Sequence, residues 1–467
     1  MKTIASRLFL LFLFLSIFFA CKKDSFSNSP ELQLTTDVDT LHFDTVFTTT
    51  GSVTQAFKIF NSNTSGIKVQ SVRLAGGDAS SFKINVDGTA GPLVTDLEIA
   101  ANDSAYVFAT VKIDPTTADL PFIVKDSIEI SYNGNSQFVQ LEAFGQNAHF
   151  HRNLEITGSE TWNNDLPHVI LGRLTIDTNA ILTINKGSNI YFHADAPFII
   201  HGSLQVNGEK WDSTKVTFTS DRLDDPYRDF PASYPGLIFT DVSKNNELNY
   251  AVIKNAYQGI AIINPSPNAA PKLILNQTII DNAYDAGILA INTSINGQNL
   301  LISNCGKNMV LIGGDYNFTH CTVASFANRF LQHKDPVLFV GNLVNNTIPP
   351  FAMNATFQNC IFWSESGGFV DNEVVVAKSG TANFNVLFNN VLWRVKNNPA
   401  NTTVTGNIIN DQDPQFDSIN TSKPFYNFRL KEGSPAINKG SNTGLVYDLD
   451  GAPRSVGLPD LGAYERQ

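Results

Sequence analysis

The chain has 467 residues, more than a single domain usually contains, and only 16% of them are charged. Its formal net charge of −11 comes without a basic stripe, which excludes a nucleic-acid-binding function. Phe is frequent, with 34 residues, and Asn, Thr, Ser and Gly are abundant. This composition predicts strands and turns rather than helices, and therefore an all-β fold.

Residues 1–20 have the pattern of an export signal: a positively charged start and an apolar segment too short for an ordinary membrane span. The segment ends in Ala20 and Cys21, which resembles a bacterial lipobox, and the residues after it resemble the lipoprotein tethers of Bacteroidetes. The resemblance implies cleavage before Cys21, attachment of a diacylglyceryl group to its sulfur, a flexible tether over residues 21–31, and an outer-membrane lipoprotein that faces the periplasm or the cell surface. The alternative is a plain secretory signal with an incidental Cys.

Residues 32–147 contain short runs in which apolar and polar residues alternate, separated by turns rich in Gly, Asn and Pro. About seven such strands in a stretch of this length predict an Ig-like β-sandwich. The segments that begin at Phe43, Ser81 and Val139 are similar to the ASPM/SPD-2/Hydin family of immunoglobulin-like modules. Modules of that family carry no active site, so the resemblance implies a spacer or a protein-contact role.

Residues 148–410 contain a repeat. The segments 248–256, 275–283 and 298–305 each place an aliphatic run before a polar residue and an Asn. Such repeats are typical of a solenoid in which each repeat forms one rung and the Asn recurs at a corner, where stacked amides can hydrogen-bond. We therefore expect a structural ladder at one corner of the coil, formed by Asn255, Asn282, Asn304, Asn359 and Asn390.

These repeats resemble the parallel β-helix superfamily, which includes pectate lyases, polygalacturonases and many surface proteins without enzymatic activity. The resemblance implies a right-handed single-stranded parallel β-helix after the Ig-like β-sandwich, and parallel crossovers in general prefer that hand. The later repeats are spaced further apart, so loops should project around Pro336 and Pro349. Insertions in a solenoid usually lie on one face, often the binding face.

Residues 411–467 follow the last repeat. The segments that begin at Asp413, Gly433 and Asp460 look like the ending shared by many bacterial parallel β-helix proteins, called choice-of-anchor Q. A solenoid needs its last open rung covered, so the resemblance implies a C-terminal cap of the β-helix.

One loop between two predicted strands is the best catalytic candidate, because it gathers four carboxylates and two arginines. Such a loop could hold Ca²⁺ against a uronate in a lyase, and acids on adjacent rungs could serve as the acid and base of a glycosidase. The carboxylates are also balanced by neighbouring Arg, as on any solvated loop. The weak candidates in this loop are Asp221, Asp224, Asp225, Arg228 and Asp229.

Two further groups could bind a metal. His193, Asp195 and His201 lie in or beside neighbouring strands, although surface or corner histidines explain them as well. Asp448 and Asp450 match the first half of a Ca²⁺ loop, but the Glu that closes such a loop is absent. Ca²⁺ is therefore the one cofactor considered, with a purely structural turn as its alternative.

Three cysteines follow Cys21 in the chain: Cys305, Cys321 and Cys360. An odd number in an exported chain leaves at least one unpaired. We expect these three cysteines to be small buried residues at one inward corner of the coil. The alternative is a disulfide between Cys305 and Cys321, because adjacent rungs lie roughly 4.8 Å apart.

Two functions fit these observations. In the first, a lipid anchor and an Ig-like stalk hold a β-helix that binds glycan or protein at the cell envelope. In the second, the same scaffold carries a polysaccharide lyase or glycoside hydrolase. The sequence favours the first, because no catalytic constellation is complete in it. Acids, Arg and aromatic residues from three or more rungs in one groove would favour the enzyme, whereas an isolated loop at residues 221–229 would count against it.

Overall fold

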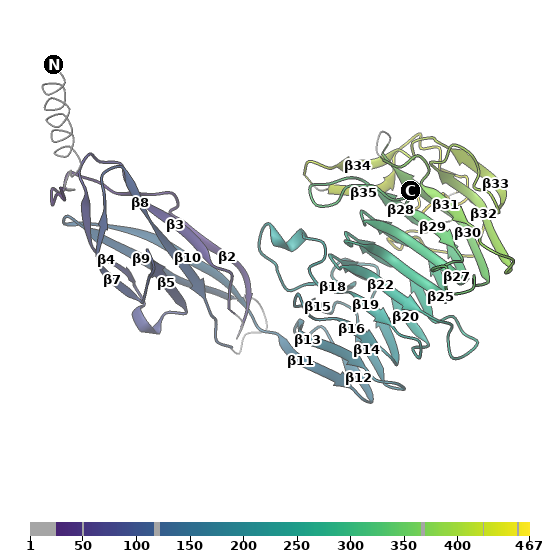
Figure 1. Ribbon diagram of the computed structural model, residues 1–467, viewed down its shortest axis with the longest axis horizontal. Coiled ribbons are helices and arrows are strands. Elements are labelled where there is room, and N and C mark those ends of the chain that lie inside the picture. Colours follow the sequence, from purple (N-terminus) through teal and green to yellow (C-terminus); the bar gives the residue numbers. More distant parts are fainter. Residues whose placement is uncertain (1–24, 49–50, 116–121, 366–368, 424, 455–456) are drawn as a thin grey trace, which may run out of the picture. The chain divides into compact units, whose positions relative to one another are not determined.

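The computed structural model describes residues 25–48, 51–115, 122–365, 369–423, 425–454 and 457–467 (Figure 1). Cys21 lies outside these ranges. The all-β prediction is confirmed: strands form nearly all of the regular structure, and the helical segments described are two short 3-10 turns, η1 (Gly77–Ala79) and η2 (Tyr227–Asp229). No helix in the described ranges is long and apolar enough to span a membrane. The chain divides into two compact units, Met1–Asn147 and Ala148–Gln467.

The N-terminal unit is a sandwich of two five-stranded sheets, as predicted. Its strands alternate buried and exposed residues, so each sheet turns one apolar face inward to a shared core. The first sheet has the order β1 (Thr35–Thr36), β3 (Gln55–Asn61), β8 (Asp103–Val111), β5 (Phe82–Val86), β6 (Thr89–Ala90). The second has the order β2 (Thr40–Phe47), β10 (Asn135–Gln146), β9 (Phe122–Tyr132), β4 (Ile67–Leu74), β7 (Leu93–Ile99).

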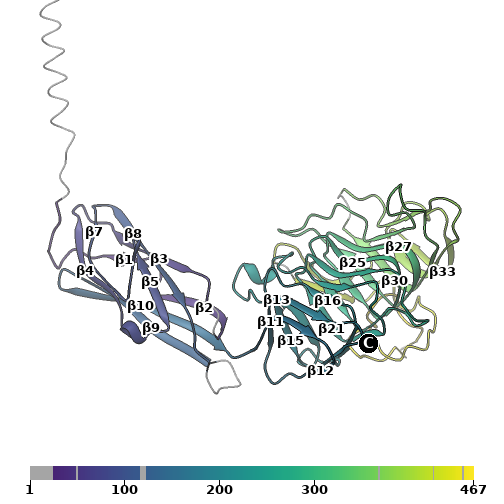
Figure 2. The same ribbon diagram turned by 60° about the horizontal axis from the view of Figure 1, so that its bottom comes forward.

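The C-terminal unit contains one continuous sheet of 23 strands, β11 to β33, in which every pairing given is parallel. Strands three apart in the chain pair with each other, as β15 does with β18 and β18 with β21, so each rung contains three strands. This is a parallel β-helix, and Figure 2 shows its strands stacked in succession from β11 to β33. The predicted fold class is therefore confirmed for both units.

The three strands of a rung form three faces of the coil, here called the first, second and third faces. The long strands turn a corner and serve two faces. The coil begins with β11 (His149–Ile156), β12 (Ser159–Trp162), β13 (His168–Ile176) and β14 (Ile181–Asn185). The first face continues with β15 (Asn189–Phe192), β18 (Val216–Ser220), β21 (Ala251–Lys254), β24 (Ile279–Asp281), β26 (Leu301–Ser303), β28 (Thr322–Ser325) and the ends of β30 (Met353–Ser364), β32 (Phe384–Trp393) and β33 (Thr403–Asn410).

The other two faces follow the same register. The second face contains β16 (Phe198–Ile200), β19 (Leu237–Phe239), β22 (Gln258–Ile263), the starts of β25 (Ala286–Gln298) and β27 (Lys307–Thr319), β29 (Leu338–Gly341) and β31 (Val374–Ala377). The third face contains β17 (Ser203–Asn207), β20 (Asn246–Asn249), β23 (Leu273–Asn276), the ends of β25 and β27, and the starts of β30, β32 and β33.

The interior of the coil is apolar. Alternate residues of each strand point inward, as the strand period of two requires, and form one core along the helix. Phe318, Phe357 and Phe388 stack on successive rungs, with ring centroids 5.7 and 4.9 Å apart and nearly parallel planes. Trp393 packs against the end of this stack, 4.9 Å from Phe388.

The predicted single Asn ladder is wrong in one respect, because its members occupy two corners. Asn255, Asn282 and Asn304 follow first-face strands in register, whereas Asn359 and Asn390 follow third-face segments. Amides do bond along each corner: Asn282 Nδ2 donates to Asn255 Oδ1 at 2.9 Å, and Asn390 Nδ2 to Asn359 Oδ1 at 3.2 Å. All five have φ between 52° and 64°. Asn tolerates this left-handed conformation well, so both corners select the same residue type.

The C-terminal segment also differs from its expected role. Instead of closing the last rung, its apolar residues pack sideways against the outer side of the first face, on Leu301, Ala324, Ile361 and Leu392. Its hairpin, β34 (Phe416–Asn420) with β35 (Phe425–Leu430), is antiparallel and lies beside β28 in Figure 1. Outward-facing aliphatic side chains on the first face supply the apolar surface that this segment buries.

Candidate ligand-binding groove

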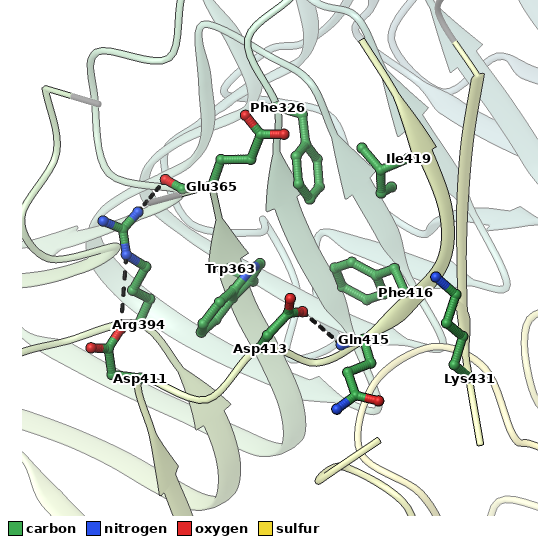
Figure 3. Close-up of a pocket in the computed structure, with 10 residues that line it drawn as sticks. All are labelled: Phe326, Trp363, Glu365, Arg394, Asp411, Asp413, Gln415, Phe416, Ile419 and Lys431. Carbon is green, nitrogen blue, oxygen red and sulfur yellow. Dashed lines mark hydrogen bonds and ion pairs between the residues drawn. The ribbon is translucent and has the colours of Figure 1, made fainter. Parts of the chain in front are cut away.

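A groove opens where the first-face strands of four successive rungs end beside the C-terminal hairpin (Figure 3). Phe326 follows β28, Trp363 lies in β30, Arg394 follows β32 and Asp411 follows β33. The cavity volume is about 860 Å³, which is large enough for several sugar rings. Its lining consists of Phe326, Trp363, Glu365, Arg394, Asp411, Asp413, Gln415, Phe416, Ile419 and Lys431.

Three aromatic rings form the apolar part of the groove. Phe326, Trp363 and Phe416 are 6%, 8% and 6% exposed, so their positions are fixed by packing. The rings of Phe326 and Phe416 meet edge to face, with centroids 6.3 Å apart. In Figure 3 the three rings lie between Arg394 on one side and Lys431 on the other.

Carboxylates and cations surround these rings. Glu365, Asp411 and Asp413 are exposed; Glu365 follows β30, and the two Asp residues follow β33. The Arg394 guanidinium donates to the Glu365 backbone carbonyl, and its Nε lies 3.9 Å from Asp411 Oδ1. Asp413 Oδ1 accepts a hydrogen bond from the Gln415 backbone N–H at 2.7 Å. Acidic, aromatic and Arg side chains of more than three rungs therefore meet in one groove, the arrangement that favours an enzyme.

A buried charge network lies directly behind Arg394. Glu373 is completely buried, and its carboxylate accepts a hydrogen bond from Ser364 Oγ at 2.6 Å. His333 Nε2 lies 2.9 Å from Glu373 Oε2, and Arg394 Nη1 lies 3.7 Å from Glu373 Oε1. A buried carboxylate is tolerated only when paired and hydrogen-bonded, so these contacts also hold Arg394 in place at the groove.

The candidate catalytic loop follows β18, so it lies at the same corner of the coil as the groove but on an earlier rung. Its main chain is docked on the Asn side chains: Asn255 Nδ2 donates to the Arg228 carbonyl at 2.7 Å, and Asn282 Nδ2 to the Asp229 carbonyl at 2.8 Å. Arg228 and Asp229 lie in η2. Asp221, Asp224 and Asp225 lie in the segment between β18 and η2.

Each carboxylate of that loop is paired with a cation or an imidazole. Arg222 holds Asp224 through two hydrogen bonds of 2.7 and 2.8 Å, and Arg228 Nε lies 2.9 Å from Asp225 Oδ1. Asp221 Oδ2 lies 2.8 Å from His193 Nδ1, and burial raises the pKa of that carboxyl. The loop supplies no side chain to the lining of the groove. Its geometry is that of a braced surface loop.

The first metal candidate, formed by His193, Asp195 and His201, is not gathered into one site. His193 pairs with the candidate loop, whereas His201 Nδ1 bonds to Thr240 Oγ1 at 3.0 Å, and Asp195 is exposed. Within the described ranges, no group of three or more His, Cys, Asp or Glu residues could hold a metal ion.

In the candidate Ca²⁺ turn, the carboxylates of Asp448 and Asp450 already accept hydrogen bonds from protein donors. Asp448 Oδ1 accepts hydrogen bonds from the backbone of Asp450 and Ala452, at 2.9 and 2.7 Å, and its Oδ2 accepts one from the Glu465 N–H. Asp450 Oδ2 is bound by the Arg429 guanidinium at 2.6 and 2.7 Å. These contacts are those of a structural turn.

A cluster of histidines on the first rungs was not predicted. His151 Nε2 lies 3.0 Å from His168 Nδ1, and both imidazoles stack on Trp162, with centroids 4.6 and 4.3 Å away. His149 sits beside them and pairs with Asp165 at 2.8 Å. Burial lowers the pKa of His151 and of His168 to about 4. His149 and His151 are neighbours on one strand, but His168 follows 17 residues after His151, and the rung register brings it beside them.

This cluster predicts acid sensitivity. An unfolded chain protonates His at about pH 6.5, whereas His151 and His168 stay neutral in the folded protein down to about pH 4. The unfolded state therefore binds more protons between pH 6.5 and 4, and the free energy of unfolding falls as the pH falls through this window. We expect a loss of roughly 3 kcal/mol for the pair, less than the full shifts because the rings stay partly hydrated.

Urea denaturation at pH 7 and pH 4.5 measures this loss. The variant His151→Phe keeps the stack on Trp162 but removes one titrating group, so it should lose about half of the cluster's pH dependence. Equal pH dependence in the variant and the unmodified protein would contradict the assignment.

None of the groove residues was predicted from the sequence. The nearest signal is the lengthened spacing of the later repeats, which placed a loop near Pro336 without saying which side chains would meet. Phe326, Trp363 and Arg394 belong to separate rungs, and only the register of the coil brings them together.

Comparison with protein-family models gives no match, and comparison with curated proteins gives none either. Twenty-four chains of solved structures match. One is a family 123 glycoside hydrolase from Clostridium perfringens, with 17% identity over 24% of this chain and a TM-score of 0.18; the match spans about a quarter (26%) of the hydrolase. Another is the ASH/PapD-like domain of human CEP192, with 9% identity over 27% of this chain and 92% of that domain, and a TM-score of 0.17. Likenesses this small carry no functional argument.

Proposed function

We propose that this chain is a lipid-anchored protein of the cell envelope whose β-helix binds a glycan in the groove. The observation that carries the proposal is the gathering of three aromatic rings and a polar rim in one cavity of about 860 Å³. A sugar presents apolar C–H faces and a ring of hydroxyls. Aromatic rings suit the first, and carboxylate and amide groups at the edge suit the second.

The charges favour a neutral glycan over an acidic one. Glu365, Asp411 and Asp413 contribute three carboxylates, whereas Arg394 and Lys431 contribute two cations. Arg394 is already engaged with the buried Glu373 and with main-chain carbonyls. A polyuronate would meet net negative charge, so we expect chains of uncharged sugars to bind more tightly.

Glycoside hydrolysis is the second candidate, and the same carboxylates favour it. Glycosidases use a pair of Asp or Glu side chains on either side of the scissile bond. Glu365 follows β30 and Asp413 precedes β34, so carboxylates from two segments line the same groove. Glu365→Gln and Asp413→Asn would then abolish product formation, whereas in a binding protein they would only weaken the affinity for the glycan.

A panel of soluble oligosaccharides tests both functions on the full chain. Neutral cello-, xylo- and manno-oligosaccharides are compared with oligogalacturonates by calorimetric titration, and new reducing ends or unsaturated products are assayed in the same samples. Binding of a neutral member without product supports the binding function, and product supports the hydrolase. Absence of both across the panel would remove the glycan proposal.

The lipid anchor is a separate prediction. Cys21→Ala removes the sulfur that the acyl group requires, so the protein should move from the membrane fraction to the soluble envelope fraction. Fractionation followed by immunoblotting measures this, with Cys305→Ala as the matched control because that cysteine is buried in the β-helix. Unchanged membrane retention of the Cys21 variant would contradict the anchor.

A further inference from the structure

The three cysteines of the β-helix are all free and buried, but they occupy two corners. Cys305 lies at the first corner, where its Sγ donates to the Ser303 carbonyl at 3.2 Å and accepts from the Ala283 N–H at 3.4 Å. Cys321 and Cys360 follow the turn residues of the other corner. The predicted alternative of a disulfide between Cys305 and Cys321 is therefore wrong, as is the expectation that all three share one corner.

Cys321 and Cys360 are direct neighbours on adjacent rungs. The register pairs Thr319 with Gln358 before them and Thr322 with Ile361 after them, so the two cysteines lie side by side. Both belong to the same buried core. Adjacent strands are roughly 4.8 Å apart, within the Cα separation of about 4.4–6.8 Å that a disulfide spans.

From this register we propose that Cys321 and Cys360 are joined by a disulfide in the exported protein. The oxidant is a protein disulfide of the envelope, which accepts two electrons. One cysteine thiolate attacks the oxidant and forms a mixed disulfide, and the second attacks the first sulfur and releases the oxidant as a dithiol. Two S–H bonds and one S–S bond are exchanged for one S–S bond and two S–H bonds, so atoms and electrons balance.

The bond must form before the core closes. Burial, reinforced by the neighbouring Cys360, raises the pKa of the Cys321 thiol well above its ordinary range. The folded interior therefore holds almost no reactive thiolate, and the same burial protects a finished disulfide from reductant.

The cross-link would lie at the start of the first-face strands that lead to the groove. Cys321 immediately precedes β28, which leads to Phe326, and Cys360 lies three residues before Trp363 in β30. A bond between them fixes the two rungs that present these aromatic side chains, and it spans the insertions after β28 and β29. The bond itself rests on the envelope location in the proposed function and not on glycan binding; only this consequence rests on the groove.

Thiol labelling of the full chain, isolated from the bacterial envelope, tests the proposal. The protein is quenched in acid, denatured, alkylated without reductant and digested with trypsin. Cleavage after Lys307, Arg329 and Lys334 places each of the three cysteines on its own peptide. We expect alkylated Cys305, no alkylated Cys321 or Cys360, and one cross-linked peptide whose mass is that of the two peptides less two hydrogens.

Two variants and a reduction control sharpen the result. Cys360→Ser should expose Cys321 to full alkylation, whereas Cys305→Ser should leave the cross-linked peptide unchanged. Reduction before alkylation should label all three sites and shows that every peptide is recovered. Full alkylation of Cys321 and Cys360 without reduction, or a cross-link to Cys305, would overturn the proposal. Neither outcome bears on glycan binding, which is measured separately.

Discussion

Replacing Phe357 with alanine should lower the free energy of unfolding by about 3–5 kcal/mol, the cost of a large cavity in a close-packed core. The ring is completely buried and stacks between Phe318 and Phe388 on the two adjacent rungs. Its removal therefore leaves a void that three rungs share. Urea denaturation of the full chain, followed by circular dichroism, measures the change.

Thr356→Ala is the matched control for this variant. Thr356 precedes Phe357 in β30 but points to the opposite side of the strand, so the change should cost less than about 1 kcal/mol. A loss below about 1.5 kcal/mol for Phe357→Ala would show that the stack is not part of a tightly packed interior.

The second large effect is expected at Glu373. Glu373→Ala leaves Arg394 and His333 without their buried carboxylate, and breaking a buried pair typically costs about 3–5 kcal/mol. The same change frees the Arg394 side chain at the edge of the groove. Denaturation measures the first effect, and a weaker affinity for the bound glycan reports the second.

Asp371→Ala is the control for Glu373, because it removes a carboxylate only two residues away. Asp371 pairs with Lys396 in solvent, with side chains 78% and 65% exposed, so its loss should leave the free energy of unfolding almost unchanged. Equal effects of the two variants would mean that the Glu373 network is not held as a buried unit.

Local sequence pattern was sufficient for the fold because strand alternation and rung repetition are short-range signals. The alternation of apolar residues in β18 predicts which of them face inward. The repeated Asn255, Asn282 and Asn304 predict one corner of the coil. The assignment of Asn359 and Asn390 to the same corner failed for a physical reason. Both corners need a residue in the left-handed region, so Asn marks a corner without saying which one.

The groove could not be predicted because its residues share no local pattern. Trp363 and Arg394 are brought beside Phe416 only by the rung register and by the sideways packing of the C-terminal segment. That segment was expected to close the end of the coil. The loop that the sequence did single out, around Asp224 and Asp225, has its charges matched by its own arginines.

The most direct test of the glycan proposal is a titration of Trp363→Ala with the neutral oligosaccharide that binds best. We expect its affinity to fall by about tenfold or more, because a buried aromatic anchor is lost. Trp211→Ala is the matched control, since that Trp is 63% exposed and does not line the groove. Glu365→Gln, an exposed change that spares the core, should weaken binding with an unchanged unfolding midpoint. Wild-type affinity in both groove variants, or an equal loss in Trp211→Ala, would contradict the account.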